Sequence, residues 1–408
     1  MKLSVIILCH NNRSIDRVVS AVAEQTAKDD EIFVVDDFSD AATQDILRKL
    51  NGNNIKVLHS DKRGNRSANR NYAANYADGE LLVFIDGDVL IEYGALDRIK
   101  NYSYDGISGI CGNVAAMRMT PETIALTSKR YSRELQRGEY DFDLWHSAFP
   151  DERRHNEALS WNRFYTAFSV IPRSEYIAVG GFDEDFEGWG GEDIDIGYRL
   201  SKNGQLKFLP SIRGIHLPHQ RNIMQEEKNG RKNMYMMLSK YRNRDMEELL
   251  SFALEARAVN ALNNVLDTLR KYENSDNAQE PLENELIFNV ASREYPNGNI
   301  AYLDEKNQRK SESFLGLALP FSDLSFEVAV TTTALLDYPE PLACRILQEL
   351  LRVCKKVKVK KVLSHNIDWN GIEEKFKYVF CYYKIHIFAD SFQDFLIEDC
   401  GDYYIIEH

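Results

Sequence analysis

The feature that most constrains the fold is a series of short apolar runs separated by helix-like segments in the first ninety residues. The runs are SVIIL from Ser4, EIFVVDD from Glu31, NIKVLHS from Asn54 and ELLVFIDGD from Glu80. Their near-continuous apolar, β-branched character is typical of strands buried on both faces. Between them, apolar residues recur three or four positions apart, as in Ile15, Val18, Val19 and Val22. The alternation predicts an α/β fold with a Rossmann-like, mostly parallel sheet and right-handed crossovers.

The rest of the chain divides by pattern into two further parts. An apolar stripe with helical spacing predicts a long helical stretch over about 233–272, and the polar segment ENSDNAQEPLENE from Glu273 is typical of a linker. Strand and helix patterns return from Leu286. We therefore expect a first domain over 1–232, a helical connector and linker over 233–285, and a small α/β domain over 286–408. The polar segment 222–233, which contains Gly230, is expected to be a mobile lid.

Composition excludes several classes of protein. The 408 residues carry a formal net charge of -13, whereas proteins that grip nucleic-acid backbones non-specifically are usually basic. Six cysteines without a CxxC pair support neither a zinc site nor a disulfide framework, which favours a reducing cytoplasm. No apolar run approaches the roughly 20 residues of a membrane helix. The opening MKLSVIILCHNN is interpreted as a buried first strand and not as a signal peptide.

The clearest candidate for chemistry is the acidic pair in Phe84-Ile85-Asp86-Gly87-Asp88, which ends a predicted strand. Alternation along an extended chain points Asp86 and Asp88 the same way, and the glycine between them lets a ligand approach the backbone. Two carboxylates suit a hard cation such as Mg²⁺ or Mn²⁺ that carries diphosphate oxygens. The alternative is a solvated acidic turn without function.

Two later segments also carry candidate site residues. Gly188-Trp189-Gly190-Gly191 precedes Glu192 and Asp193, so that an aromatic platform for a sugar ring stands beside two carboxylates at a helix start. The alternative is an N-capped helix after a glycine-rich turn. Further on, Gly214-Ile215-His216-Leu217-Pro218-His219 places histidines at a strand end. A neutral histidine there can bind a metal, although a lone histidine is more often structural.

These pieces occur together, and over about the first 220 residues the chain resembles family 2 glycosyltransferases of the GT-A fold. The matching segments are SVIILCHNN, VVDDFSD, RSANRNYAANYADGELLVFIDGD, GGFDEDFEGWGGEDIDIGYRL and GIHLPH. The Trp-Gly-Gly-Glu-Asp stretch is similar to that of β1,4-galactosyltransferases, chondroitin polymerases and polypeptide N-acetylgalactosaminyltransferases. The order of five motifs indicates the class of enzyme but not the sugar.

The resemblance implies a donor site. His10, Asn11 and Asp37 match positions that contact the nucleotide base and ribose, with Asp36 as the alternative to Asp37. Arg70 and Asn71 match an element near the uracil and diphosphate, although Asn69 stands where alanine is typical.

The resemblance also implies a metal site and a catalytic pair. Asp86 matches a ribose or sugar contact, Asp88 a metal ligand, and His216 a second metal ligand with His219 as the alternative. Glu192 would hold the acceptor or donor sugar beside Trp189, and Asp193 would be the general base.

The function expected from this resemblance is an inverting, metal-dependent glycosyltransferase that uses Mn²⁺ or Mg²⁺. It would move a hexose or N-acetylhexosamine from a nucleotide diphosphate sugar, expected to be UDP-linked, to an acceptor hydroxyl on a glycan, peptide or other polymer. One alternative is a catalytically inactive GT-A scaffold or binding protein. A nicotinamide-binding enzyme would need GxGxxG after the first strand, where this chain has Cys9-His10-Asn11-Asn12.

The last part of the chain has a resemblance of its own. The segment from Pro320 to Val359 resembles the distal half of a class I methyltransferase, but the glycine-rich cofactor loop of that family is missing upstream. We therefore expect a degenerate Rossmann-like domain that docks the acceptor or mediates homo-oligomer contacts, with the helical connector as the alternative surface for those contacts. Its lysine-rich run 355–361 is expected to be a solvated strand edge.

Overall fold

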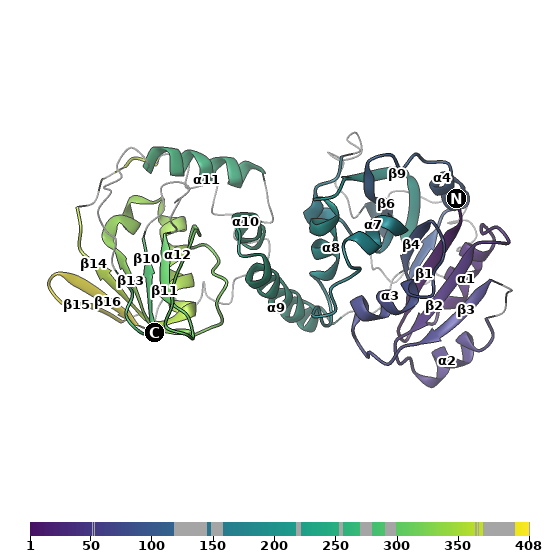
Figure 1. The fold of residues 1–408 in the computed structure, drawn as a ribbon, viewed down its shortest axis with the longest axis horizontal. Helices are drawn as coiled ribbons and strands as arrows, with labels where there is room; N and C mark the ends of the chain where they lie inside the picture. Colours follow the sequence, from purple (N-terminus) through teal and green to yellow (C-terminus); the bar gives the residue numbers. More distant parts are fainter. Residues whose placement is uncertain are drawn as a thin grey trace. The chain divides into compact units, whose positions relative to one another are not determined.

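The structure is a computed structural model of two compact units, Met1–Asn233 and Met234–His408 (Figure 1). It describes residues 1–50, 52, 54–117, 145–147, 158–217, 222–252, 256–269, 280–289, 299–363, 365, 367–369 and 396–407. Within these ranges, no helix combines the length and the apolar character needed to cross a bilayer.

The first unit is built on one mixed sheet with the strand order β3-β2-β1-β4-β8-β6-β9-β5 and with β7 paired to β6. The strands are β1 (Leu3–Cys9), β2 (Glu31–Asp36), β3 (Ile55–His59), β4 (Leu81–Asp86), β5 (Val89–Ile91), β6 (Ile107–Met117), β7 (Trp145–Ser147), β8 (Phe168–Pro172) and β9 (Gln205–His216). The first four lie where the sequence pattern predicts strands, and they run parallel. The expected α/β class is confirmed.

Register brings the candidate residues to one edge of the parallel half. Cys9 pairs with Asp36 on one side of β1, and Leu8 pairs with Asp86 on the other. The loops that follow β1, β2 and β4 therefore start side by side at the carboxyl ends of the strands, where open α/β sheets bind ligands.

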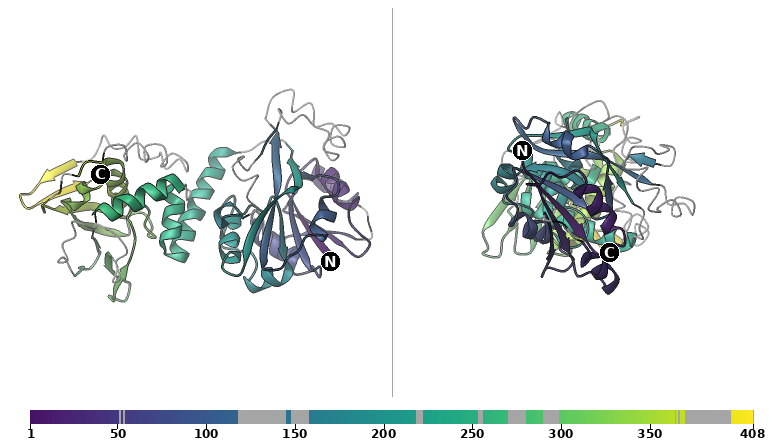
Figure 2. Two further views of the ribbon diagram at one scale, coloured as in Figure 1. Left: turned by 90° about the horizontal axis from the view of Figure 1, so that it is seen from above. Right: turned by 90° about the vertical axis from the view of Figure 1, so that its right-hand side faces the viewer.

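Helices cover both faces of this sheet (Figures 1 and 2). They are α1 (Ile15–Ala23), α2 (Ala41–Leu47), α3 (Arg66–Ala74), α4 (Ala95–Lys100), α7 (Arg173–Ala178) and α8 (Glu192–Leu200), with a 3₁₀ turn at Trp161–Arg163. Helices α1, α2 and α4 bury their apolar residues in one core, whereas α3, α7 and α8 contribute to a second core on the opposite face. Along β1, Val5 and Ile7 enter the first core and Ile6 enters the second, which explains the unbroken apolar run.

The expectation of a loop-like lid over 222–233 is wrong, because this segment is the first part of helix α9 (Ile223–Tyr241). The Asn222 side chain accepts the backbone N–H of Gln225 at 3.2 Å and so caps the helix start. Polar residues here form the solvated side of a helix, while Asn233 and Met234 are buried.

The helical stretch expected over about 233–272 consists of three helices in the described residues. Helix α9 ends at Tyr241, and α10 (Arg244–Phe252) and α11 (Ala256–Leu269) follow. The break is at Arg242, which has a φ of 44° and whose guanidinium donates to Glu312 Oε1 at 2.9 Å and Oε2 at 2.6 Å. This ion pair stabilises the left-handed backbone conformation of Arg242, which is incompatible with an α-helix, so the helix ends here.

The second unit has a sheet of its own with the order β12-β11-β10-β13-β14-β16-β15. Its strands are β10 (Glu285–Phe288), β11 (Ile300–Leu303), β12 (Arg309–Glu312), β13 (Phe326–Thr332), β14 (Cys354–Lys360), β15 (Leu396–Asp399) and β16 (Tyr403–Glu407), with helix α12 (Glu340–Val353) between β13 and β14. The lysine run was expected at a sheet edge, but β14 is an interior strand between β13 and β16. Lys356, Lys358 and Lys360 alternate along β14 and share one face of the sheet, and Lys358 and Lys360 are exposed there.

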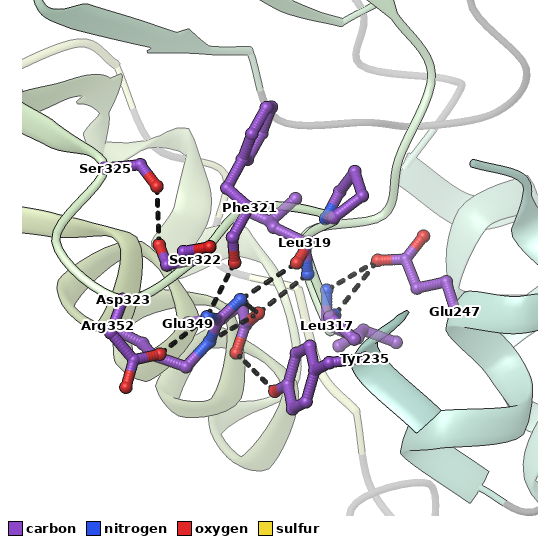
Figure 3. A network of polar contacts seen from close by, with 12 residues as sticks. Tyr235, Glu247, Leu317, Leu319, Phe321, Ser322, Asp323, Ser325, Glu349 and Arg352 are labelled. Atoms are coloured by element: carbon purple, nitrogen blue, oxygen red, sulfur yellow. Dashed lines mark hydrogen bonds and ion pairs between the residues drawn. The ribbon is translucent and has the colours of Figure 1, made fainter. Parts of the chain in front are cut away.

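A buried polar network holds the loop before β13 in the second unit (Figure 3). Glu247 on α10 accepts the backbone N–H groups of Leu315 at 2.7 Å, Leu317 at 2.8 Å and Ala318 at 3.3 Å. Glu349 on α12 accepts the next one, from Leu319, at 2.7 Å. Two carboxylates thus satisfy four buried donors of the loop within residues 315–319, and Glu247 joins α10 to this loop.

The two carboxylates differ in their protonation. Burial raises the pKa of Glu247 to about 7, since the backbone bonds only partly offset the cost of a buried charge. Burial also disfavours the charged form of Glu349, but Arg352 and Arg345 outweigh it and lower the pKa of Glu349.

Candidate active site

A cavity of about 710 Å³ opens at the carboxyl ends of β1 and β4. Its described lining comes from the loops after β1, β2 and β4, the start of α3, and the residue after β9: Leu8, Cys9, His10, Asn11, Asn12, Arg13, Ser14, Asp37, Arg66, Asn69, Asp86, Gly87, Asp88 and Leu217. The volume suits a small-molecule ligand. Gly87 is required here, because a Cβ would lie 2.2 Å from the carbonyl oxygen of Leu8.

The rim of the cavity is a hydrogen-bonded frame around His10. Its Nδ1 donates to the carbonyl oxygen of Asp37 at 2.6 Å, so its Nε2 is free to accept from the Asn11 side chain at 3.1 Å. Asn11 has a φ of 49° and its Oδ1 accepts the backbone N–H of Asp40 at 2.7 Å. Asp37 Oδ1 accepts the backbone N–H of Gly64 at 2.8 Å. The rim is therefore shaped before any ligand arrives.

Asp36 and Asp37 have different places in the structure. Asp37 lines the cavity, whereas Asp36 is only 2% exposed and accepts from Ser39 at 3.1 Å and His59 at 3.2 Å. Burial raises the pKa of Asp36, but the bonds from Ser39 and His59 prevail and lower it. Asp36 thus stabilises the loop after β2, and Asp37 is the residue of this pair that can contact a ligand in the cavity.

Beside the cavity, one buried arginine joins three carboxylates from distant parts of the chain. The guanidinium of Arg70, 2% exposed, lies 3.2 Å from Asp86 Oδ1, 3.3 Å from Glu192 Oε1 and 3.5 Å from Asp193 Oδ1. Burial disfavours the charge of Arg70, but the three carboxylates outweigh it and raise its pKa. One positive charge faces three acidic groups, so the cluster is short of positive charge.

Asp193 is the carboxylate with the strongest perturbation in this cluster. Burial and the charge of Glu192 raise the pKa of Asp193 to about 7, against the opposing effect of Arg70. Its side chain remains 23% exposed. A carboxylate that takes up a proton near neutral pH and is reachable from outside is suited to general-base work.

The turn before Asp193 is shaped by glycines and by helix α9. Gly188, Gly190 and Gly191 have φ values of 75°, 90° and 97°, which other residues rarely adopt. The Asn233 side chain donates to the carbonyl oxygens of Glu187 at 3.0 Å and Gly190 at 2.7 Å, and so fastens the turn.

Trp189 is presented by this turn with 37% of its surface exposed. A Cβ at Gly230 of α9 would lie 3.4 Å from the Trp189 ring, so this part of the helix packs closely against the indole. The arrangement leaves an apolar platform near the acidic cluster.

Asp88 and His216 are brought together by strand pairing. Val89 of β5 pairs with His216 of β9, and the Leu217 backbone N–H donates to the Asp88 carbonyl oxygen at 2.8 Å. Asp88 Oδ1 then lies 3.6 Å from His216 Nε2. A carboxylate oxygen and an imidazole nitrogen at this spacing fit a divalent cation that takes its other ligands from diphosphate and water. His219 lies outside the described residues, in which no cluster of three or more metal-binding side chains occurs.

Comparison with known proteins gives the class of this unit. Residues 4–170 match the model of glycosyl transferase family 2, and residues 152–220 match that of the N-terminal domain of galactosyltransferase. The N-terminal unit belongs to the family 2 glycosyltransferases. The segments matched on sequence resemblance fall within these two ranges, so the expected family is confirmed.

Individual relatives share the glycosyltransferase domain. Validoxylamine A glucosyltransferase from Streptomyces hygroscopicus subsp. jinggangensis is 31% identical over 247 residues, which are 54% of this chain and 56% of the relative. Polypeptide N-acetylgalactosaminyltransferase 3 from Taeniopygia guttata is 26% identical over 38% of this chain and 27% of its own. The solved structure of S. aureus TarS 1-349 with UDP-GlcNAc has a TM-score of 0.46 at 17% identity, covering 62% of this chain and 71% of that one. The chain spans about half the length of the curated glucosyltransferase that it matches.

The expected site residues divide into those that line the cavity and those that do not. The cavity is lined by His10, Asn11, Asp37, Asp86 and Asp88, whereas its described lining does not include Asp36, Arg70, Asn71, Trp189, Glu192, Asp193 or His216. Arg70 lies in the acidic cluster and not in the described lining of the cavity. Asn71 faces away, because its amide donates to the Phe182 carbonyl oxygen and to Glu184 Oε1, both at 2.8 Å. On a helix, neighbouring residues point about 100° apart, so both could not face the same ligand.

Sequence reasoning missed two kinds of residue, some that line the cavity and one that contacts Asp193. Asn12 and Arg66 line the cavity. Asn12 directly follows the candidate pair His10 and Asn11, and Arg66 stands four residues before the candidate Arg70. Thr166 donates its backbone N–H to Asp193 Oδ2 at 3.2 Å and its hydroxyl to Oδ1. No sequence signal marks Thr166, since its partner lies 27 positions further along the chain.

Proposed function

We propose that the protein is an inverting, metal-dependent glycosyltransferase. It transfers a hexose or N-acetylhexosamine from a nucleotide diphosphate sugar, UDP-linked, to an acceptor hydroxyl on a glycan, peptide or other polymer. The observation that carries the proposal is the acidic cluster: Asp193, with its pKa raised to about 7 and its side chain 23% exposed, shares the Arg70 guanidinium with Asp86, which lines the cavity. The proposed base is therefore linked through Arg70 to a residue in the wall of the proposed donor pocket.

The donor side of the proposal assigns roles to the cavity residues. The frame of His10, Asn11 and Asp37 would hold the base and ribose, and Asp86 would contact the ribose or the sugar. Asp88 and His216 would hold Mn²⁺ or Mg²⁺, whose charge would stabilise the departing diphosphate. Their 3.6 Å spacing and the place of Asp88 in the cavity lining support this assignment.

On the acceptor side, the exposed indole of Trp189 would stack on a sugar ring and bring one hydroxyl to Asp193. The acceptor oxygen would form its bond to the anomeric carbon as the bond from that carbon to the phosphate oxygen breaks. Asp193 would take the hydroxyl proton during this step, and the nucleoside diphosphate would leave with the electron pair. A single displacement inverts the anomeric centre and needs no covalent enzyme intermediate.

The second unit and the location of the protein belong to the same proposal. The second unit would dock the polymer acceptor or bind a second copy of the chain. The scattered cysteines support a reducing compartment, and we place the protein in the cytoplasm.

The decisive experiment measures nucleotide release and product formation with a panel of UDP- and GDP-sugars, including UDP-glucose because of the named activity of the glucosyltransferase relative. Asp193→Asn should lower transfer by about 10²–10⁴-fold with the donor KM nearly unchanged, since it keeps the shape of the side chain but removes the basic oxygen. Glu192→Gln is the matched variant at the adjacent position. Normal transfer by Asp193→Asn beside an inactive Glu192→Gln would assign the base to Glu192. No turnover of any donor by the intact protein would favour an inactive scaffold.

A further inference from the structure

Thr166 and Asp193 form a two-point contact in the glycosyltransferase unit. The backbone N–H of Thr166 donates to Asp193 Oδ2 at 3.2 Å, and its hydroxyl donates to Oδ1. Thr166 is completely buried, so its hydroxyl is shielded from bulk water. Arg70 lies 3.5 Å from the same Oδ1. The two carboxylate oxygens are therefore unequal, because Oδ1 has a hydroxyl donor and a cation, whereas Oδ2 has a long bond to a neutral amide.

We infer that Thr166 is a positioning residue for the proposed general base: its hydroxyl holds Oδ1 of Asp193 and leaves Oδ2 to receive the acceptor proton. This inference rests on the proposed function of Asp193. A carboxylate that is free to rotate about its χ2 torsion would offer either oxygen, and the two-point contact removes that freedom. A base held in one orientation reaches the transition state with less reorganisation.

The hydroxyl of Thr166 also acts on the charge of Asp193. A hydrogen bond to the charged form favours deprotonation, so it opposes the burial that raises the pKa of Asp193. The other groups that face this carboxylate are Arg70 from α3, Glu192 on its own helix, Asp86 from β4 and the Cys111 thiol from β6. Arg70 is the only one of these four that favours the charged form.

The experiment compares Thr166→Val with Thr166→Ser in the full chain. Valine keeps the branched shape and the backbone N–H but removes the hydroxyl, whereas serine keeps the hydroxyl. We expect Thr166→Val to lower kcat by about 10- to 100-fold at pH 7 with an unchanged donor KM, because Thr166 is not part of the described lining of the cavity. The acid limb of its pH–kcat profile should move to higher pH. Thr166→Ser should restore both kcat and the profile.

Ser169→Ala is the matched control. Ser169 on β8 is also completely buried, and its hydroxyl oxygen has no hydrogen-bond partner within the described part of the chain. Its removal should leave kcat and the pH profile unchanged. A role of Thr166 in folding alone would lower the amount of active enzyme without moving the acid limb.

The outcomes separate this inference from the proposed function. If Asp193→Asn abolishes transfer while Thr166→Val has the normal kcat and the normal acid limb, Asp193 is the base and the role of Thr166 is wrong. If Asp193→Asn transfers sugar normally, the proposed base itself is wrong, and the inference about Thr166 fails with it. If Thr166→Val lowers kcat and shifts the acid limb, and Thr166→Ser restores both, the result supports Asp193 as the base and Thr166 as its positioning residue.

Discussion

Arg70→Gln tests whether the acidic cluster depends on its one buried cation. The substitution leaves Asp86, Glu192 and Asp193 facing one another without the guanidinium that lies 3.2–3.5 Å from all three. Removing one partner of a buried ion pair costs about 3–5 kcal/mol, because the remaining charge is left uncompensated. We expect a loss of this size in the free energy of unfolding of the first unit at pH 7.5.

The pH dependence of this loss follows from the pKa of Asp193. Burial and Glu192 already raise it to about 7, and Arg70 opposes them, so removal of Arg70 raises it further. A carboxyl whose folded-state pKa is raised is stabilising in its protonated form, and that stability is lost as pH rises through the folded pKa. The penalty of Arg70→Gln should therefore be smaller at pH 5.5 than at pH 7.5.

The assay is hydrogen exchange of β1 and β4 peptides in a urea series, which reports opening of the first unit by itself. Arg48→Gln is the control, because Arg48 forms an ion pair with Asp45 on the surface, where its side chain is 68% exposed. Such pairs contribute less than about 1 kcal/mol. The reasoning is refuted if Arg70→Gln costs no more than Arg48→Gln, or if its penalty grows as the pH falls.

Three further outcomes are expected. Asp88→Asn should nearly abolish transfer and leave the unfolding free energy unchanged, and EDTA should inhibit the unmodified protein; full transfer rate in EDTA would remove the metal from the proposal. The unfolding free energy of the second unit should fall by about 3 kcal/mol as pH rises from 4.5 to 7, because burial raises the pKa of Glu247 from its usual 4.5 to about 7. Hydrogen exchange of β13 peptides measures this free energy, and its dependence on pH should vanish in Glu247→Gln. Asn233→Ala should raise the acceptor KM without changing the donor KM, since it releases the turn that carries Trp189; equal changes in both constants would contradict this.

Much of the first unit could be predicted from local pattern. Strands β1 to β4 follow from unbroken apolar runs, which arise because each strand sends alternate residues into cores on both faces. The placement of His10, Asp37 and Asp86 at one edge follows from parallel pairing alone. The helix breaks at Arg242 and the helical form of 222–233 could not be predicted in this way, since they depend on Glu312 and on packing against the glycine-rich turn.

By itself, the sequence determined which residues are apolar enough to build the sheet, where its strands end and which acidic groups follow them. Only the tertiary structure decided which of those groups meet. Arg70 reaches Glu192 across 122 positions, Thr166 reaches Asp193 across 27, and Asn71 turns away although it is the neighbour of Arg70. The physical reason is that burial leaves a periodic trace along the chain, whereas a hydrogen bond between distant side chains leaves none. Its free energy depends on a distance of about 3 Å that only the packed strands and helices can set.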